Sequence, residues 1–169
     1  MTKQFMDSVV LEYKEPQFFE GRIDTANFTQ FLYSERELEL EEIYQKFIDR
    51  ECGIWIHSIL YLYLYDSLCW FPTLDCLYNK ETTGFDITGI FAITSKGSGI
   101  LQKIMSAWIS LFQNAPEDIY LRGLYNHQIS KNEFLKIPKS KCLEHLAAIL
   151  DATENVSQGK GILYVFPES

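Results

Sequence analysis

The stretch that decides the fold is Phe85–Phe112, FDITGIFAITSKGSGILQKIMSAWISLF. Its first part, Phe85–Thr94, alternates in the way that is typical of a strand buried mainly on one side. The glycine-rich SKGSG follows at Ser95–Gly99, and Ser98 is placed to cap a helix. Apolar residues at helical spacing then predict a helix that ends before Pro116 and packs on a large surface: Leu101, Ile104, Met105, Trp108, Ile109 and Phe112.

Toward the C-terminus the same kind of alternation continues. Ile119–Tyr125 (IYLRGLY) has the pattern of a strand, and a polar connection rich in lysine follows it. A helix is expected over about Lys139–Asn155, and a last strand over Ile162–Phe166 before a proline. The second half therefore runs strand, helix, strand, helix, strand.

The N-terminal part predicts a different order. Ser8–Lys14 (SVVLEYK) is short, β-branched and alternating, which indicates a first strand. Asp24 can cap a short helix that runs through Tyr33. Ser34 with Glu37 has the spacing of a capping box, which would open a second helix that runs to about Cys52.

The most apolar stretch, Ile54–Phe71, approaches the length that spans a bilayer. Leucine and tyrosine alternate through Leu60–Tyr65, and Asp66 would be costly in hydrocarbon. We therefore interpret the stretch as one or two buried strands that continue toward Leu77, and expect no membrane association. A polar turn is predicted at Asn79–Gly84 (NKETTG).

Length and composition set the fold class. The chain has 169 residues, of which 47% are hydrophobic and 22% charged, so it has ample material for a packed core. We expect a single globular α+β domain over residues 1–169, of mixed α/β order. A single sheet of about five to six strands, covered by about four helices, fits the succession of elements.

The charge balance bears on the kind of partner. Fifteen Lys and Arg face 23 Asp and Glu, a net charge of −8, which argues against direct nucleic-acid binding and favours a basic protein partner. The second helix would carry an acidic face opposite its apolar stripe. These acids are predicted to face the partner: Glu35, Glu39, Glu42 and Asp49. The alternative is a solvated helix face with no binding role.

The first residues, MTKQFMDSVV, lack the pattern of a secretory signal, so we expect a cytoplasmic protein with reduced cysteines. The four cysteines form no CxxC pair: Cys52, Cys69, Cys76 and Cys142. Cys142 and His145 would supply half a zinc site at most, whereas a structural zinc takes about four ligands. No metal, no cofactor and no catalytic residue is therefore predicted.

Ser95–Gly99 supports one alternative. Amides at a helix N-terminus carry partial positive charge and bind phosphates. Gly97-Ser98-Gly99 resembles the helix-entry loop of acyl-coenzyme-A-dependent acetyltransferases, Q/R-x-x-G-x-G/A, with Thr94 in the place of the first residue. The resemblance implies an enzyme whose amides from Lys96 to Gly99 face a pyrophosphate, with Ser95, Lys96, Gly97, Ser98 and Gly99 as the site. The other interpretation is a tight turn.

A second resemblance covers Ile100–Tyr125, ILQKIMSAWISLFQNAPEDIYLRGLY. An apolar helix, a Trp, a Leu-Phe pair, Ala-Pro and a short strand ending in Gly-x-Tyr are similar to a pattern in bacterial immunity proteins that neutralise polymorphic or contact-dependent toxins. The resemblance implies a cytoplasmic, non-catalytic inhibitor that binds a cognate toxin domain and blocks its active site or substrate access. The acidic balance agrees with it, because toxins that act on nucleic acid, such as nucleases, carry basic surfaces.

Overall fold

The computed structural model describes residues 8–16, 18–19, 22–23, 28–48, 53–85 and 89–167. The largest sheet in it has six strands in the order β5-β4-β11-β8-β6-β7, and every neighbouring pair runs antiparallel. The strands are β4 (Phe28–Ser34), β5 (Ile54–His57), β6 (Pro72–Asp75), β7 (Lys80–Thr83), β8 (Phe91–Ile93) and β11 (Ile162–Pro167). The last strand of the chain thus lies in the middle of the sheet, with Val165 opposite Phe31 and Phe91.

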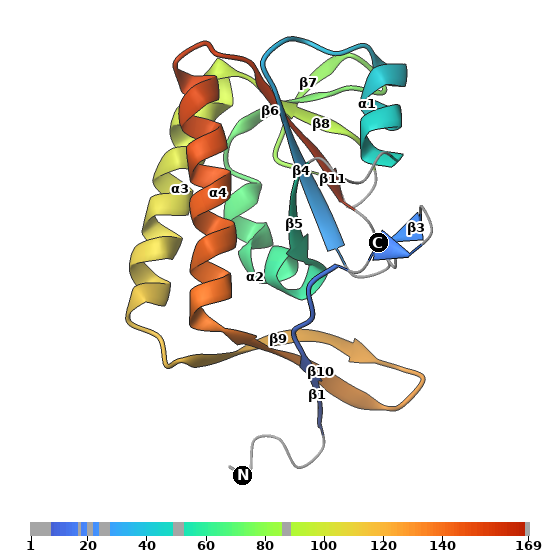
Figure 1. The fold of residues 1–169 in the computed structure, drawn as a ribbon, viewed down its shortest axis with the longest axis vertical. Coiled ribbons are helices and arrows are strands. Elements are labelled where there is room, and N and C mark those ends of the chain that lie inside the picture. The colour runs from blue at the N-terminus through green and yellow to red at the C-terminus, as the bar shows by residue number, and fades with distance from the viewer. Residues whose placement is uncertain are drawn as a thin grey trace.

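Helices cover the two faces of this sheet unequally. On one face lie α2 (Ser58–Leu68), α3 (Ser95–Gln113) and α4 (Lys139–Ser157), and on the other lies α1 (Leu40–Ile48) (Figure 1). Alternate residues of β11 explain the two layers. Leu163 and Val165 pack with the three helices, whereas Tyr164 packs with Ile43 and Phe47 of α1.

A three-stranded sheet has the order β1-β10-β9. The hairpin of β9 (Asp118–Asn126) and β10 (Lys131–Pro138) connects α3 to α4, and β1 (Ser8–Glu12) pairs parallel to β10. A two-stranded ladder joins β2 (Phe18–Phe19) to β3 (Arg22–Ile23). The expected α+β class is confirmed, with four helices in the described residues, but the strands belong to three sheets where a single sheet was expected.

The long periodic elements agree best with the sequence. The predicted helices at Leu101–Phe112 and Lys139–Asn155 are α3 and α4, and the strands at Ser8–Lys14, Ile119–Tyr125 and Ile162–Phe166 are β1, β9 and β11. The alternating strand at Phe85–Thr94 is shorter, because only Phe91–Ile93 is strand within the described residues. Residues 86–88 lie outside them.

The short helix expected from Asp24 through Tyr33 is wrong in its described part, which is strand β4. Residues 28–32 are all buried, because β4 lies between β5 and β11 and is covered on both faces. A strand of this kind has no alternation of polar and apolar residues. The sequence pattern therefore could not distinguish it from a helix.

The capping box expected at Ser34 and Glu37 does not form, because Ser34 ends β4 opposite Ile162. Helix α1 begins six residues later, at Leu40. A carboxylate oxygen of Glu42 accepts the backbone N–H of Glu39 at 3.1 Å, which is the reciprocal half of a capping box at the true start of the helix.

The prediction of one or two strands over Ile54–Phe71 is wrong for most of this range. Only Ile54–His57 is strand, and Ser58–Leu68 is helix α2. The Nδ1 atom of His57 accepts the backbone N–H of Ile59 at 3.1 Å and so caps this helix. The leucines at positions 60, 64 and 68 are four residues apart and share one buried face, although leucine and tyrosine also alternate along the sequence.

Two polar segments are strands where none was predicted. The expected turn at Asn79–Gly84 contains β7, and the actual turn is at residues 76–79. The lysine-rich connection contains β10. All four residues of β7 are exposed, because it is an edge strand, so its sequence carries no apolar pattern.

Candidate functional site

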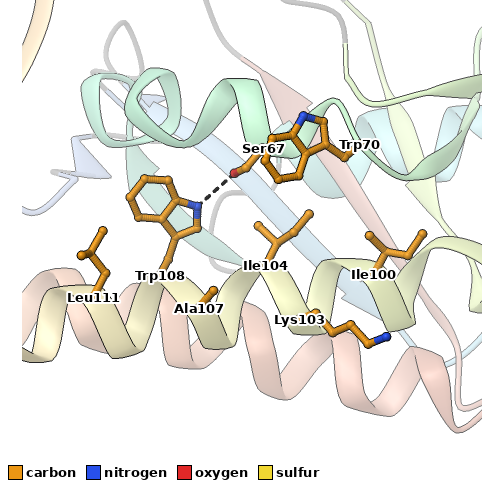
Figure 2. Close-up of a pocket in the computed structure, with 8 residues that line it drawn as sticks. All are labelled: Ser67, Trp70, Ile100, Lys103, Ile104, Ala107, Trp108 and Leu111. Carbon is orange, nitrogen blue, oxygen red and sulfur yellow. Dashed lines mark hydrogen bonds between the residues drawn. The ribbon is translucent and has the colours of Figure 1, made fainter.

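An apolar groove lies between helix α3 and the end of helix α2 (Figure 2). Its volume is about 520 Å³, within the range of sites that hold ligands or partner side chains. We call it the α3 groove, and its lining residues are Ser67, Trp70, Ile100, Lys103, Ile104, Ala107, Trp108 and Leu111. Apart from Ser67 and Lys103 they are all apolar.

The groove follows from the local structure on both sides. Helix α2 ends at Leu68, and the chain turns so that Phe71 is fully buried while its neighbour Trp70 is 67% exposed. Opposite it, α3 buries the stripe that contains Leu101, Met105 and Phe112. A second apolar row on the same helix, with Ile100, Ala107 and Leu111, has no partner to cover it among the described residues.

The wall of the groove is a fixed aromatic cluster. The indole N–H of Trp108 donates to the Ser67 hydroxyl at 2.9 Å, and this hydroxyl donates to the Leu64 carbonyl at 2.7 Å (Figure 2). The Trp108 ring stacks on Phe112 and meets the edge of Tyr63, with centroids 5.6 Å apart in both pairs. With its polar atom bonded and its ring held, Trp108 presents a rigid apolar face.

The exposure of the groove is unusual for a surface with no partner. Trp70 is 67% exposed and Leu111 is 57% exposed, and both border the same hollow. Apolar residues scattered over a surface are normal, whereas large contiguous apolar patches mark sites of interaction. Tryptophans in such patches supply much of the binding energy in protein interfaces.

The charge of the groove differs from that of the chain. Helix α3, SKGSGILQKIMSAWISLFQ, has two lysines and no carboxylate, in a chain with a net charge of −8. Lys96 is bound to Glu81. Lys103, at the rim of the groove, forms no ion pair with any residue that the structure describes. Among the described residues, the one charged group lining the groove is therefore a cation without an ion-pair partner.

The acids predicted to face a partner lie elsewhere. Glu35, Glu39 and Glu42 are on the connector and first turn of α1, on the sheet face opposite α3. Glu35 and Glu39 are exposed, and Glu39 borders a second hollow of about 380 Å³ beside α1. A carboxylate oxygen of Glu42 lies 2.6 Å from an Nη atom of Arg36, and this hydrogen bond, together with that from the Glu39 amide, lowers the pKa of Glu42 to about 2. Asp49 lies outside the described residues.

Ser95–Gly99 forms the first turn of α3, so the helix begins at Ser95 and is not capped by Ser98. Thr94 precedes it without a side-chain capping bond. The Thr94 carbonyl accepts the amides of Gly97 and Ser98, both at 3.0 Å, so two of the four amides expected to face a pyrophosphate are bonded within the turn. Gly97 and Ser98 are buried, whereas Ser95, Lys96 and Gly99 are exposed.

Two buried titratable side chains, His145 and Cys142, lie on α4, away from the groove. His145 is buried and its Nε2 lies 2.8 Å from the Tyr13 hydroxyl, which donates to Glu15 at 2.9 Å. Burial lowers the pKa of His145 and raises the pKa of the Cys142 thiol to about 12. Such a thiol is a weak nucleophile. The predicted free thiols are confirmed for Cys69, Cys76 and Cys142, and Cys52 lies outside the described residues.

Among the described residues, no three His, Cys, Asp or Glu side chains form a group that could hold a metal ion. No helix in this part of the chain combines the length and the apolar character needed to cross a bilayer. Comparison with protein-family models, curated proteins and solved structures finds no match to this chain.

Part of the groove can be predicted from the sequence, but not its role as a site. Ile104 and Trp108 belong to the core stripe that the helical spacing predicts, and both do contact the core. Trp70 falls in the stretch Ile54–Phe71, which the sequence predicts as buried strand, and it is instead exposed. A signal was present, because Ile100, Ala107 and Leu111 widen the apolar arc of α3 beyond one core-facing stripe. A wide arc alone, however, is also typical of a fully buried helix.

Proposed function

We propose that this chain is a non-catalytic protein-binding inhibitor of the immunity-protein type, which neutralises a cognate basic toxin by direct binding. The observation that carries the proposal is the α3 groove, where Trp70 and Leu111 are largely exposed on one apolar hollow. A partner that covers this surface removes it from water, and the burial of apolar area contributes a favourable free energy of about 25 cal/mol per Å². The rigid Trp108 loses little side-chain freedom on binding.

The acidic side chains have a different role in this proposal. Glu35 and Glu39 lie on the other face of the large sheet, so they act on a basic partner through the long-range field and not through the groove. A field of this kind mainly raises the rate of association, and salt screens it. Contacts in the groove mainly set the rate of dissociation.

The test uses the immobilised chain, lysate of the source organism and native mass spectrometry. The wild type and two variants are compared. Leu111→Glu places a charge in the groove, and Leu124→Glu is its matched control, because Leu124 is 66% exposed on β9. We expect the wild type and the control to retain one stoichiometric basic protein, and Leu111→Glu to lose it. Equal retention by all three, or no basic protein, would contradict the proposal.

The role of the acids is tested with the captured protein. The double variant Glu35→Lys and Glu39→Lys leaves the Arg36–Glu42 pair intact. We expect a slower association rate at low salt, an unchanged dissociation rate and a flatter dependence of association on salt. An unchanged association rate would remove these acids from the proposal.

A further inference from the structure

We infer that the α3 groove receives an amphipathic α-helix of the partner, with its apolar face on the tryptophans and a carboxylate on Lys103. The inference rests on the proposed function and names the chemistry of the partner segment. It is carried by the shape of the groove, by its backbone environment and by its charge.

The shape matches the side of a helix. Ile100, Ile104, Ala107 and Leu111 form one row along α3, about 16 Å long, or three helical turns. Helix α4 packs along another side of α3 and matches it in length, each having 19 residues. Figure 1 shows α3 at the outer edge of the helical layer, and the exposed side chains of Ile100 and Leu111 show that no described element covers this row. A helix placed there would pack its ridges between those of α3.

The backbone around the groove favours a helix over an extended segment. The lining residues belong to α2, α3 and the turn after α2, and none belongs to a strand. Within these helices the backbone N–H and C=O groups bond to each other. An extended peptide would therefore find no strand edge for its own backbone, whereas a helix brings its backbone bonds already made.

The charge of the groove indicates which residues flank the apolar face of the partner helix. Lys103 has no anionic partner among the described residues, and α3 contains no Asp or Glu. A carboxylate beside the apolar stripe of the incoming helix would complete this pair. A second copy of the chain would bring α3 against α3 without a carboxylate, and each copy carries a net charge of −8. The charges therefore favour a different protein over a second copy.

The test uses two synthetic 18-residue helical peptides with blocked termini. Both carry leucines at the spacing i, i+3, i+4 and i+7, which places them on one face of the helix. The peptides differ only in the residues that flank this apolar face, which are Glu in one peptide and Lys in the other. Binding is measured by calorimetry and by the change in tryptophan fluorescence, to which Trp70 and Trp108 in the groove contribute. We expect the wild type to bind the Glu peptide at least about fivefold more tightly than the Lys peptide. This ratio corresponds to an ion pair that contributes about 1 kcal/mol to binding.

Three variants make the test specific. Lys103→Glu should reverse the order of the two peptides, and Leu111→Glu should abolish binding of both. Lys131→Glu changes the charge by the same amount at an exposed position on β10, and it should leave the order unchanged. Circular dichroism and urea unfolding check that each variant is folded.

Several results would overturn the inference. Equal affinities of the two peptides would rule out a carboxylate contact with Lys103. No binding of either peptide at millimolar concentration would rule out a helix as the occupant of the groove. A groove-dependent dimer of the chain alone would show that the occupant is a second copy. The proposed function is tested separately, by the capture experiment with lysate. Groove-dependent capture with equal peptide affinities overturns the carboxylate alone, and groove-dependent capture with no peptide binding overturns the helix. Capture that is unaffected by Leu111→Glu overturns the proposed function.

Discussion

Gly97 is the residue in Ser95–Gly99 whose small size the fold requires. A Cβ atom on Gly97 would overlap the carbonyl oxygen of Pro72 and lie 3.2 Å from the ring of Phe71. The glycine lets the first turn of α3 approach the start of β6 closely. This packing accounts for a glycine that the sequence also allowed to be a phosphate-binding residue.

Gly97→Ala should therefore lower the free energy of unfolding by about 1–3 kcal/mol, since backbone must move to admit the methyl group. Gly99→Ala is the matched control, because nothing lies within 4 Å of its Cβ position. We expect that variant to be more stable by about 0.5–1 kcal/mol, because alanine loses less backbone freedom in a helix. Urea unfolding measures both, and equal effects would contradict the close packing.

His57 makes stability depend on pH. Burial lowers the pKa of His57 from 6.5 to about 4, against a weaker opposing effect of Glu133. The unfolded chain therefore binds a proton at a pH where the folded chain does not. The stabilisation is fully present above pH 6.5, and it is lost as the pH falls from 6.5 to 4.

Over that range His57 should account for a decrease of about 3 kcal/mol in the free energy of unfolding. His57→Asn keeps a capping side chain for α2 and removes the titration. We expect the variant to have a shallower dependence of stability on pH between 4 and 6.5. Urea unfolding at several pH values measures it, and an unchanged slope would assign the effect to another group.

At the level of the elements, α2 shows where sequence periodicity is ambiguous. Leucines at positions 60, 62, 64 and 68 fit both a strand and a helix over this short range. The helix buries positions 60, 64 and 68 and leaves Leu62 partly exposed, whereas a strand would make Leu62 equivalent to Leu64. Substitutions at these two positions therefore distinguish the two structures.

Leu64→Ala should lower the free energy of unfolding by about 2–5 kcal/mol, because Leu64 is fully buried in the main core. Leu62→Ala should cost clearly less, since part of that side chain is already in contact with water. Thermal and urea unfolding of the two variants provide the comparison. Equal losses would support the strand that the alternation of leucine and tyrosine predicts.

For the whole molecule, the contacts that join distant parts of the chain were beyond prediction. Strand β1 lies beside β10, more than a hundred residues away, and Tyr13 just after it bonds to His145 on α4. Nothing near Tyr13 in the sequence indicates either partner. The strand itself was predicted because its alternation is local, and its position in a sheet was not.

Tyr13→Phe should lower the free energy of unfolding by about 1–2 kcal/mol, because it leaves the buried Nε2 of His145 without its partner. Amide hydrogen exchange should accelerate in β1 more than in β11, which lies in the middle of the large sheet. Tyr78→Phe is the control, since Tyr78 is 79% exposed. Uniform acceleration across the molecule would show that the contact has no local role.

The sequence by itself determined the α+β class, the long helices α3 and α4, and the strands β1, β9 and β11. Helices α3 and α4 and strand β9 are buried mainly on one side, and one-sided burial produces a period that neighbouring residues reveal. Strand β1 is a short alternating segment, and β11, which is buried on both faces, is a short apolar run before a proline. Strand β4, buried on both faces, and β7, exposed throughout, have no such period, so the sequence did not predict them.

The tertiary structure alone decided the candidate site. Trp70 and Phe71 are adjacent and both aromatic, yet one is 67% exposed and the other is fully buried. No local pattern separates them, because burial depends on what the rest of the chain places beside each side chain. The α3 groove exists because α4 covers one side of α3 and no described element covers the other. An uncovered apolar surface is a property of the packed molecule, and the sequence can only supply the residues for it.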